Sequence, residues 1–549
     1  MKKIIPPLAK DESLVKEKPL HLDDMLAAAG VHVEALDDGM DFEQAKQNAL
    51  KKIDLTAVQD DLPDDGTPTL ICPHCWHRFK KARIYSISRH PSLVGDTVLG
   101  ADAQIRFLAT RFTADGSALD ACGMVCPDLA CPRCHLQIPE SLMTMPYSLV
   151  SIVGSPSSGK SYFLTAMLFR LKSILMQFNY ALSEADASMD MVLSRYEQLL
   201  FYNTSNNTYV ALPKTELQGS DFSSQVHLDG IDLQLPLPFV YTLKPLASGV
   251  GTPPAKNLVL YDNAGEHFEP GRDSVTNPAT QHLVNSECIM FLFDPFKDSR
   301  SIDDCSKLDP QGGDFRQTAN QVQILNEMIA RIKKSPERAR QAQGKYPAPL
   351  IVVIPKFDAW KGSFPINEMD NDGYVGTNPA NGFQALDITN VRMVSYAARQ
   401  WLLRRIPELP SVAEAFFENV YYIPVSALGR GPEYDRERNI LGVRPDHLNP
   451  LWCEVPMLIY LWHSGHVAGI LQPFPDARPA DEYCTFRNGV LFFQPPNARF
   501  PQGIPDMFQG MDVYDEQLGL IRLPRCPEEE RPSTQAASAS ADGDDFWNS

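Results

Sequence analysis

One stretch of the chain places glycines, a lysine and a serine at the spacing that binds phosphate. Residues 149–161 read LVSIVGSPSSGKS, an apolar run that opens into Gly-x-x-x-x-Gly-Lys-Ser. The glycines let the backbone curl, so that successive N–H groups and the N-terminus of a following helix converge on phosphate oxygens. We expect Lys160 to reach the β- and γ-phosphates of a nucleotide and the Ser161 hydroxyl to ligate Mg²⁺. The predicted loop consists of Gly154, Ser155, Pro156, Ser157, Ser158, Gly159, Lys160 and Ser161.

A turn rich in glycine and serine can match this motif by accident, so the neighbouring segments decide its meaning. The apolar run before Gly154 is typical of a buried strand, and residues 162–171, YFLTAMLFRL, are typical of a helix. Strand, loop and helix in this order are the context in which the motif binds nucleotide phosphates. The sequence therefore predicts a nucleotide site at this turn.

Four cysteines form two short pairs that could hold a metal ion. Cys72-Pro-His-Cys75 and Cys131-Pro-Arg-Cys134 are knuckles of the same Cys-Pro-x-Cys type. Four thiolates suit a tetrahedral Zn²⁺ site, with backbone N–H groups of each turn donating to sulfur. Alternative ligands close by in the sequence are Cys122, Cys126, His74, His77 and His135.

A redox role is the competing interpretation of these cysteine pairs. That motif is expected once, at the start of a helix, whereas this chain has two copies. The long stretch between the pairs predicts a small inserted fold, with strands near residues 84–88 and 105–111. We expect zinc to hold the module together and the module to dock a partner protein.

The elements that must position these residues read as alternating strands and helices. Short all-apolar strands separated by helices are typical of a mainly parallel sheet covered on both faces. The expected strands are residues 256–261, 288–293, 350–354 and 420–425, and the expected helices are 190–201, 278–287, 316–332, 391–406 and 456–467, with a further strand around 233–243. The predicted fold class is α/β: a mainly parallel sheet flanked by helices, preceded by a small zinc-ribbon module and flanked by flexible acidic termini.

Polar residues follow several of these strands. Asp262-Asn-Ala-Gly265 ends the first, where a strand parallel to that of the phosphate loop would deliver a carboxylate to Mg²⁺ and a flexible amide to a terminal phosphate. Lys356 and Asp358 follow a later strand, and Ser426 and Ala427 follow the last. Each group alone could be a turn former or a solvated pair, so the prediction depends on their order along the chain.

This ordered set of motifs resembles the P-loop GTPases of the translation-factor and Ras-like class, known as TRAFAC. Within that class the chain looks most like the large bacterial GTPases with an N-terminal zinc ribbon, which are double-GTPase-like and associated with conflict or defence. The resemblance covers about residues 67–469. It implies GTP or GDP with Mg²⁺ as ligands, Zn²⁺ in the ribbon, and partner proteins of a multi-component system.

The resemblance also implies how a guanine base would be read. The Lys356 stem would pack on the ring, and Asp358 would accept hydrogen bonds from its N1 and exocyclic amino groups. Ser426 and Ala427 would approach the guanine O6 through their backbone N–H groups.

Three features depart from the family pattern, two of them single residues and one the length of a segment. Pro355 stands where the family usually has Asn or Thr, and proline offers neither a polar side chain nor an N–H, so guanine selectivity should be looser. Glu266 follows Gly265 where Ras-like members carry a Gln that orients the attacking water, which predicts slow intrinsic turnover. The segment before Asp262 is unusually long, so the first-switch threonine is assigned to Thr215, with Thr208 as the second choice.

The overall charge limits the classes of function. The 549 residues include 50 Lys and Arg against 68 Asp and Glu, a net charge of −18. Non-specific binding to DNA or to an anionic membrane needs positive charge, so both are disfavoured, although the zinc module could still contact nucleic acid. The N-terminal MKKIIPPLAKDESL lacks the apolar core of a signal peptide, and no apolar run approaches the ~20 residues of a membrane span. We expect a cytoplasmic protein.

Shifts in composition predict five segments. They are an acidic, partly disordered arm (1–66), the zinc-ribbon module with its insertion (67–146), the GTPase domain (147–471), an extension rich in proline and aromatic residues (472–525), and a disordered acidic tail (526–549).

Three hypotheses on function follow. The first is a Mg²⁺-dependent GTPase switch in which Lys160 neutralises charge, Gly265 senses the γ-phosphate and Glu266 acts on the water. The second keeps the fold but makes it an ATPase, because Pro355 weakens the guanine reader. The third is a scaffold that binds nucleotide with negligible turnover and assembles partners through its zinc module and acidic ends.

Overall fold

The computed structural model describes most of the chain between residues 69 and 470. The described residues are 69–185, 191–203, 209–212, 223–228, 230–247, 252–262, 281–305, 320–334, 344–364, 369, 371–378, 382–435 and 440–470, with four short strands beyond them. They divide into two compact units. The first takes its residues from Met1–Thr144, Gln218–Pro238 and Pro270–Gln281, and the second from Met145–Leu217, Phe239–Glu269 and His282–Ser549. The predicted acidic arm and acidic tail lie outside the described residues.

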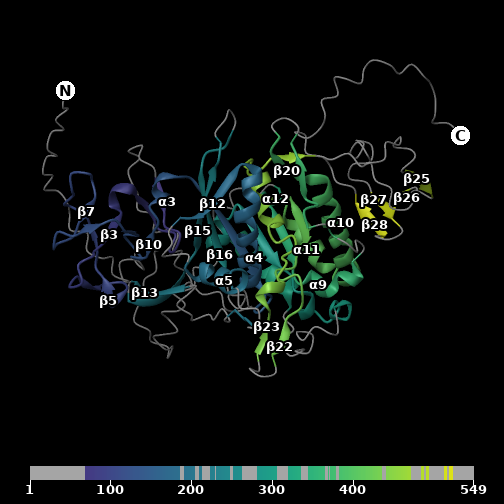
Figure 1. The fold of residues 1–549 in the computed structure, drawn as a ribbon, viewed down its shortest axis with the longest axis horizontal. Coiled ribbons are helices and arrows are strands. Elements are labelled where there is room, and N and C mark those ends of the chain that lie inside the picture. Colours follow the sequence, from purple (N-terminus) through teal and green to yellow (C-terminus); the bar gives the residue numbers. More distant parts are fainter. Residues whose placement is uncertain are drawn as a thin grey trace, which may run out of the picture. The chain divides into compact units, whose positions relative to one another are not determined.

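The first unit contains the cysteine module, which is built from very short antiparallel strands (Figure 1). Its largest sheet has the order β10-β9-β3-β6, from Gln137–Ile138, Leu129–Ala130, Tyr85–Ile87 and Arg106–Leu108. Three further pairs are β1 (Thr69–Ile71) with β2 (Arg78–Lys80), β4 (Val94–Asp96) with β5 (Gly100–Gln104), and β7 (Ala118–Leu119) with β8 (Val125–Cys126). Strands this short bury little apolar surface, so a metal cross-link is an expected source of stability. The two strands predicted in the insertion correspond to β3 and β6.

A hairpin from a distant part of the sequence belongs to the same unit. β13 (Ser223–Leu228) and β14 (Ile231–Pro236) pair antiparallel. The His227 N–H donates to the Val98 carbonyl at 2.8 Å, and the Pro236 carbonyl lies 3.1 Å from Nδ1 of His74. This hairpin therefore folds with the cysteine module, although it lies inside the 147–471 segment predicted for the GTPase domain. An isolated two-stranded hairpin is marginal in water, so its packing partner is set by tertiary contacts that no local pattern encodes.

The second unit is organised around a seven-stranded sheet of order β12-β15-β16-β11-β17-β18-β21. The central strand β11 is parallel to both of its neighbours, and the sheet continues in parallel through β18 to β21. On the other side β15 runs antiparallel to β16, and β12 runs antiparallel to β15. The strands are β11 (Tyr147–Gly154), β12 (Tyr180–Glu184), β15 (Phe239–Pro245), β16 (Lys256–Asp262), β17 (Cys288–Leu292), β18 (Leu350–Ile354) and β21 (Val420–Pro424). The predicted α/β class is confirmed, and the parallel sheet is interrupted only by β15.

Helices pack on this sheet from both sides. The main helices are α4 (Lys160–Ile174), α5 (Met191–Phe201), α6 (Gln281–Asn285), α7 (Gln321–Lys334), α9 (Phe357–Trp360), α10 (Ile388–Arg405), α11 (Glu408–Phe416) and α12 (Val455–His463). Crossovers between parallel strands are right-handed, so α4, which leads toward the β12 edge, lies on the opposite face from α7 and α10, which lead toward β21. The strands between them are apolar and buried; β17 and β18 are buried along their whole length.

Local sequence explains why two elements have other bounds in the structure than the sequence predicted. The strand expected around residues 233–243 is split into β14 and β15, because Pro236 and Pro238 stand at the break and proline cannot donate to a strand ladder. The last predicted helix, 456–467, ends at His463, because Gly465 adopts a left-handed φ of 76° just beyond it.

Smaller sheets complete the second unit. They are β19 (Val375–Thr377), β20 (Gln384–Asp387) and β24 (Gly469–Ile470); β22 (Glu433–Asp435) with β23 (Ile440–Gly442); and β25 (Cys484–Arg487), β26 (Val490–Phe493), β27 (Asp512–Asp515) and β28 (Gly519–Arg522). Among the described helices, none combines the length and apolar character needed to cross a bilayer.

Candidate functional site

The phosphate-binding loop predicted from the sequence connects β11 to α4. Gly154 ends the strand, where a Cβ would come within 2.9 Å of the Leu292 Cβ on β17. Gly159 precedes the first residue of α4 with φ of 89°, a conformation that side chains disfavour. The first glycine is thus needed for close packing of two strands, and the second for the turn into the helix.

Lys160 folds back over this loop. Its ammonium donates to the carbonyl oxygens of Gly154, at 3.1 Å, and Ser155, at 2.9 Å, and the residue is only 8% exposed. The next residue, Ser161, donates from Oγ to Oδ2 of Asp262 at 3.3 Å. The structure therefore brings the Asp262 carboxylate to the adjacent Lys160 and Ser161, which lie about a hundred positions earlier in the sequence.

The Asp262 carboxyl is held in an environment suited to a cation. Burial raises its pKa to about 6, while the nearby Lys160 ammonium and the Ser161 hydroxyl lower it. Its Oδ1, like the Ser158 hydroxyl, is buried without a hydrogen-bond partner among the described residues. Such atoms are costly to leave unsatisfied, and an oxygen donor set of hydroxyl and carboxylate fits Mg²⁺.

Asp294 and Gln321 join the loop to the neighbouring strand, and sequence reasoning gave neither a role. Gln321, at the start of α7, accepts from the Asp294 N–H at 2.8 Å and donates to the Asp294 carbonyl at 2.9 Å. Its Oε1 also accepts from the Ser155 hydroxyl at 3.4 Å. The position of Asp294 directly after a buried strand was an available signal. No sequence pattern pointed to Gln321, because its partners, Ser155 and Asp294, come from two other segments.

The predicted base-reading residues lie at the same edge of the sheet. The Lys356 ammonium donates to Oδ2 of the buried Asp294 at 2.7 Å and sits 5.0 Å from the centre of the Phe296 ring. Asp358 accepts from the Ser426 hydroxyl, and burial raises the pKa of this carboxyl above its usual value. A hydrogen bond therefore joins Asp358, a predicted base-reading residue, to Ser426, which was predicted to lie beside the same base.

The backbone N–H groups proposed to meet guanine O6 are not equivalent. The Ser426 N–H donates to the Leu451 carbonyl at 3.0 Å, so it is already engaged in a bridge between the two segments. The Ala427 N–H has no backbone partner among the described residues. Of the two groups, the Ala427 N–H is the one without a backbone partner there, and its contact with guanine stays a prediction. Sequence order could not distinguish the two because the Leu451 contact is tertiary.

Four predicted residues cannot be placed. Gly265, Glu266, Thr215 and Thr208 lie outside the described residues. Their roles in the two switches stay predictions.

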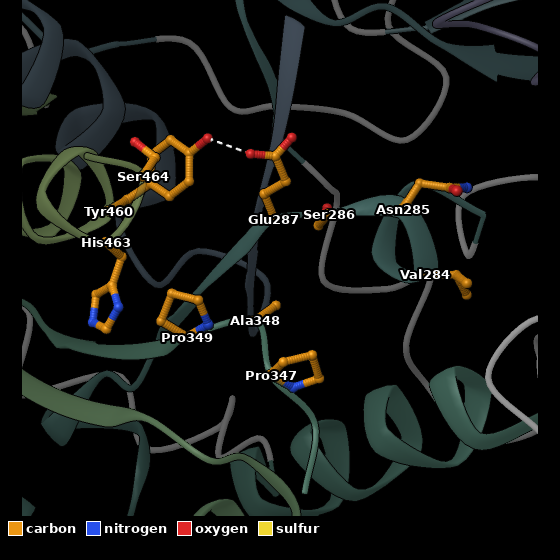
Figure 2. A pocket seen from close by; sticks show the side chains of 10 residues that line it. All are labelled: Val284, Asn285, Ser286, Glu287, Pro347, Ala348, Pro349, Tyr460, His463 and Ser464. Atoms are coloured by element: carbon orange, nitrogen blue, oxygen red, sulfur yellow. Dashed lines mark hydrogen bonds between the residues drawn. The ribbon is translucent and has the colours of Figure 1, made fainter. Parts of the chain in front are cut away.

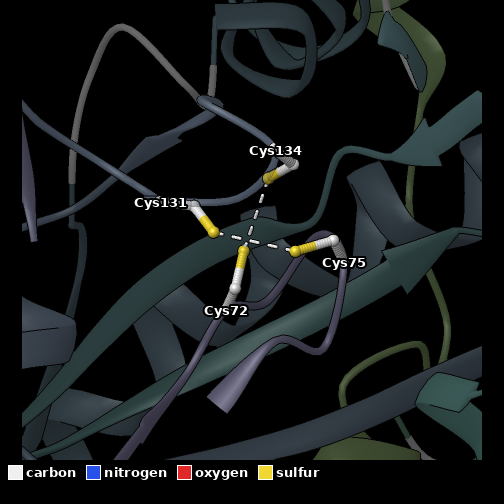
Figure 3. A group of neighbouring side chains, drawn as sticks. All are labelled: Cys72, Cys75, Cys131 and Cys134. Carbon is white, nitrogen blue, oxygen red and sulfur yellow. Dashed lines mark hydrogen bonds between the residues drawn. The ribbon is translucent and has the colours of Figure 1, made fainter. Parts of the chain in front are cut away.

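The four predicted cysteines of the first unit come together (Figure 3). The Sγ atoms of Cys72 and Cys134 are 3.7 Å apart, as are those of Cys75 and Cys131, and all four lie within 4.8 Å of one another. A tetrahedral ion with Zn–S bonds of about 2.3 Å places its sulfurs about 3.8 Å apart. The cluster can therefore hold a metal ion with this geometry. Without one, burial raises the pKa of the Cys72 and Cys134 thiols well above their usual value.

The two knuckles have matching backbones. In each, the N–H two residues after the first cysteine donates to its sulfur at 3.4 Å, from His74 to Cys72 and from Arg133 to Cys131. The residue after each second cysteine has a left-handed φ, 63° at Trp76 and 60° at His135. The predicted N–H to sulfur bonds are present, and the repeated Cys-Pro-x-Cys sequence folds the same way twice.

The alternative ligands have other contacts or lie apart from the cluster. The two ring nitrogens of His74 face the carbonyls of Pro236 and Gln137, at 3.1 and 2.9 Å. His135 Nδ1 lies 2.8 Å from the Asp96 carboxylate. His77, Cys122 and Cys126 are not members of the cluster.

A cavity of about 510 Å³ lies elsewhere in the second unit (Figure 2). Glu287 and Pro349, which line it, precede β17 and β18, so the cavity is at the amino ends of these strands. The Tyr460 hydroxyl donates to Glu287 at 2.7 Å across it. The phosphate loop is at the carboxyl end of a parallel strand, and ligands of open α/β sheets bind at that edge. This cavity is therefore not the candidate nucleotide site.

Comparisons with known proteins give weak likenesses. No protein-family model and no curated protein matches this chain. Among solved structures it is similar to the Ski7 GTPase-like domain of S. cerevisiae bound to GTP, with 16% identity, 60% of this chain and 52% of that chain covered, and a TM-score of 0.24. It is also similar to Era in complex with MgGDPNP and nucleotides 1506-1542 of 16S ribosomal RNA, with 14% identity, 52% of each chain covered and a TM-score of 0.18. The chain thus spans about half the length of each, and TM-scores this low carry no conclusion about fold or function.

Proposed function

We propose that this chain binds guanine nucleotide with Mg²⁺ at residues 154–161 and hydrolyses GTP to GDP and inorganic phosphate. The observation that supports this most is the approach of Ser161 to Asp262, 3.3 Å between Oγ and Oδ2, beside the buried Lys160. A hydroxyl and a carboxylate suit Mg²⁺, and an ammonium suits the phosphates. Phosphoryl transfer at such a site depends on positioning and charge neutralisation.

Guanine is the proposed base because the Asp358 carboxylate lies at the same edge of the sheet. Asp358 would accept from the N1 and amino groups of guanine, the Lys356 stem would pack on the ring, and the Ala427 N–H would approach O6. Pro355 offers no polar side chain, so we expect modest rather than strict selectivity over adenine.

The remaining parts of the proposal concern the switches and the metal module. Gly265 would sense the γ-phosphate, Glu266 would act on the attacking water, and Thr215 would complete the Mg²⁺ site. The four-cysteine cluster would hold Zn²⁺, which suits buried tetrahedral thiolates, and its module would dock partner proteins of a cytoplasmic, multi-component bacterial system.

Nucleotide selectivity of the purified chain tests the proposal. We expect labelled GDP to bind with Mg²⁺ and to be displaced better by GTP than by ATP, and Lys160→Ala to abolish binding. Asp358→Asn should shift preference from guanine toward xanthine, because the amide donates where the carboxylate accepts. Equal affinity for ATP and GTP would instead indicate an ATPase. Tight GTP binding without phosphate release would indicate a scaffold.

A further inference from the structure

A second lysine reaches the phosphate loop from outside the motif. Lys297 ends the 3-10 helix η5 (Pro295–Lys297), directly after β17. β17 pairs in parallel with β11, with Leu292 opposite Gly154, so the turns that follow the two strands are neighbours. The Lys297 ammonium donates to the carbonyl oxygen of Pro156, in the middle of the loop.

The backbone at Lys297 is held by hydrogen bonds to the buried Asp294. The Lys297 N–H donates to the Asp294 carbonyl at 3.1 Å, and the Asp294 carboxylate accepts from the Phe296 N–H at 3.1 Å. Asp294 is fully buried and is held in turn by Gln321 and by the Lys356 ammonium. The start of the Lys297 side chain is therefore held in place, while its flexible four-carbon stem lets the ammonium exchange one partner for another.

The two lysines make the same kind of contact with the same loop. Lys160 donates to the carbonyls of Gly154 and Ser155, and Lys297 donates to the next carbonyl, that of Pro156. A charge-assisted bond from ammonium to phosphate is stronger than one from ammonium to a neutral carbonyl. A bound triphosphate would therefore draw both ammonium groups from the loop carbonyls to its oxygens.

We propose that Lys297 is a catalytic residue that neutralises charge on the γ-phosphoryl group during hydrolysis, in addition to Lys160 and Mg²⁺. In this step water attacks the γ-phosphorus and the bond from phosphorus to the β–γ bridging oxygen breaks. The electron pair of that bond leaves with GDP, and the proton lost by the water is released to solvent as phosphate forms. Lys297 neither gives nor takes a proton; it stabilises the charge that develops on the oxygens. This proposal rests on the proposed GTP hydrolysis.

Single-turnover hydrolysis by the full chain with Mg²⁺ tests the role. We expect Lys297→Ala to lower the rate constant about 100-fold, as removal of one transition-state donor does elsewhere, with the affinity for GDP unchanged. Lys297→Arg should restore most of the rate, because it keeps the cation. Arg300→Ala is the matched control, since this nearby cation pairs instead with Asp298 and Glu408.

Each outcome separates the roles that Lys297 could have. Wild-type rates in Lys297→Ala would overturn the proposal. An equal loss of GTP and GDP affinity, with a lower melting temperature, would also overturn the proposal. It would show that Lys297 only stabilises the conformation of the loop. If the wild-type chain binds GTP but does not hydrolyse it, the proposed GTPase function fails. The Lys297 contact is then still tested by binding, because Lys297→Ala should weaken a non-hydrolysable GTP analogue about tenfold relative to GDP.

Discussion

At the scale of single residues, Asp262 is the group whose ionisation should matter most. Its Oδ1 is buried without a hydrogen-bond partner among the described residues, and its Oδ2 accepts from Ser161, next to Lys160. Its pKa, raised to about 6, means that the metal-free fold holds the carboxyl proton more tightly than the unfolded chain does, while Mg²⁺ needs the carboxylate. Protons and Mg²⁺ should therefore compete at this residue near pH 6.

The first prediction concerns Asp262→Asn in the protein free of metal and nucleotide. Because the pKa is raised on folding, from 3.8 to about 6, the stabilising contribution is full below about pH 4 and is lost as the pH rises through 6. The neutral amide escapes this loss, so the variant should gain about 1 to 3 kcal/mol in the free energy of unfolding at pH 8, and less at pH 5. Urea unfolding at the two pH values measures the difference.

The control for this substitution is Asp372→Asn, whose side chain is 68% exposed. It should show little change at either pH. A gain in Asp262→Asn at pH 5 as large as that at pH 8 would contradict the assignment. With Mg²⁺ and nucleotide present, we expect Asp262→Asn to lower the free energy of unfolding instead of raising it, because the variant loses a metal ligand.

At the scale of elements, α7 connects the phosphate loop to the strand beside it. Its first residue, Gln321, bonds both backbone groups of Asp294 and the hydroxyl of Ser155. The rest of the helix packs through an apolar stripe that includes Leu325, Met328 and Ile332. The packing fixes the helix, and the polar end then fixes the turns after β11 and β17 relative to each other.

The second prediction is that Gln321→Ala loosens this edge of the sheet. Removing the side chain leaves the Asp294 N–H and carbonyl buried without these partners, which should cost about 1 to 3 kcal/mol in the free energy of unfolding. Affinity for GTP and GDP should fall together, because the loop itself is displaced. Denaturant unfolding and nucleotide titration measure both effects.

Gln323→Ala, an exposed position on the same helix, is the matched control and should leave both quantities unchanged. If Gln321→Ala destabilises the fold but binds nucleotide as tightly as the wild type, the link from α7 to the loop has no functional consequence.

At the scale of the whole molecule, the chain leaves the unit that contains the seven-stranded sheet and returns to it. Between α5 and β15 it contributes the hairpin β13–β14 to the unit of the cysteine module. His74, inside the first knuckle, faces Pro236 at the end of that hairpin. A metal ion held by the four cysteines should therefore stabilise a segment that lies, in sequence, between residues 154–161 and Asp262.

The third prediction follows from this arrangement. Chelation of the metal, or Cys75→Ser, should raise backbone hydrogen exchange in β9, β10, β13 and β14, because the cross-link that joins the knuckles is lost. The strands β17 and β18 should stay protected, since they belong to the other unit and are buried along their whole length. Hydrogen exchange measured by mass spectrometry, together with metal analysis, follows both regions at once.

Cys122→Ser is the matched control, since this cysteine is exposed and outside the cluster. It should leave metal content and exchange unchanged. A hairpin that stays protected after complete metal loss would show that β13–β14 is held independently of the cluster.

The sequence by itself determined the elements with strong local patterns. The apolar strands β11, β16, β17, β18 and β21 were predicted within a residue or two, because burial on both faces demands uninterrupted apolar runs. The turn from strand to helix at residues 154–161 and the turns of both cysteine knuckles were also predicted, since the conformation of each depends on residues within it. The break after Pro236 could also have been predicted, because proline has no N–H to donate to a strand ladder.

Only the tertiary structure decided which distant groups meet. Gln321 reaches Ser155 and Asp294, Lys297 reaches Pro156, and the Ser426 N–H is occupied by Leu451. The same holds for the hairpin β13–β14, which joins the cysteine module rather than the sheet that surrounds it in sequence. These contacts arise where separate segments end at one edge or pack on one another. Their geometry comes from the register of whole strands, which no spacing along the chain records.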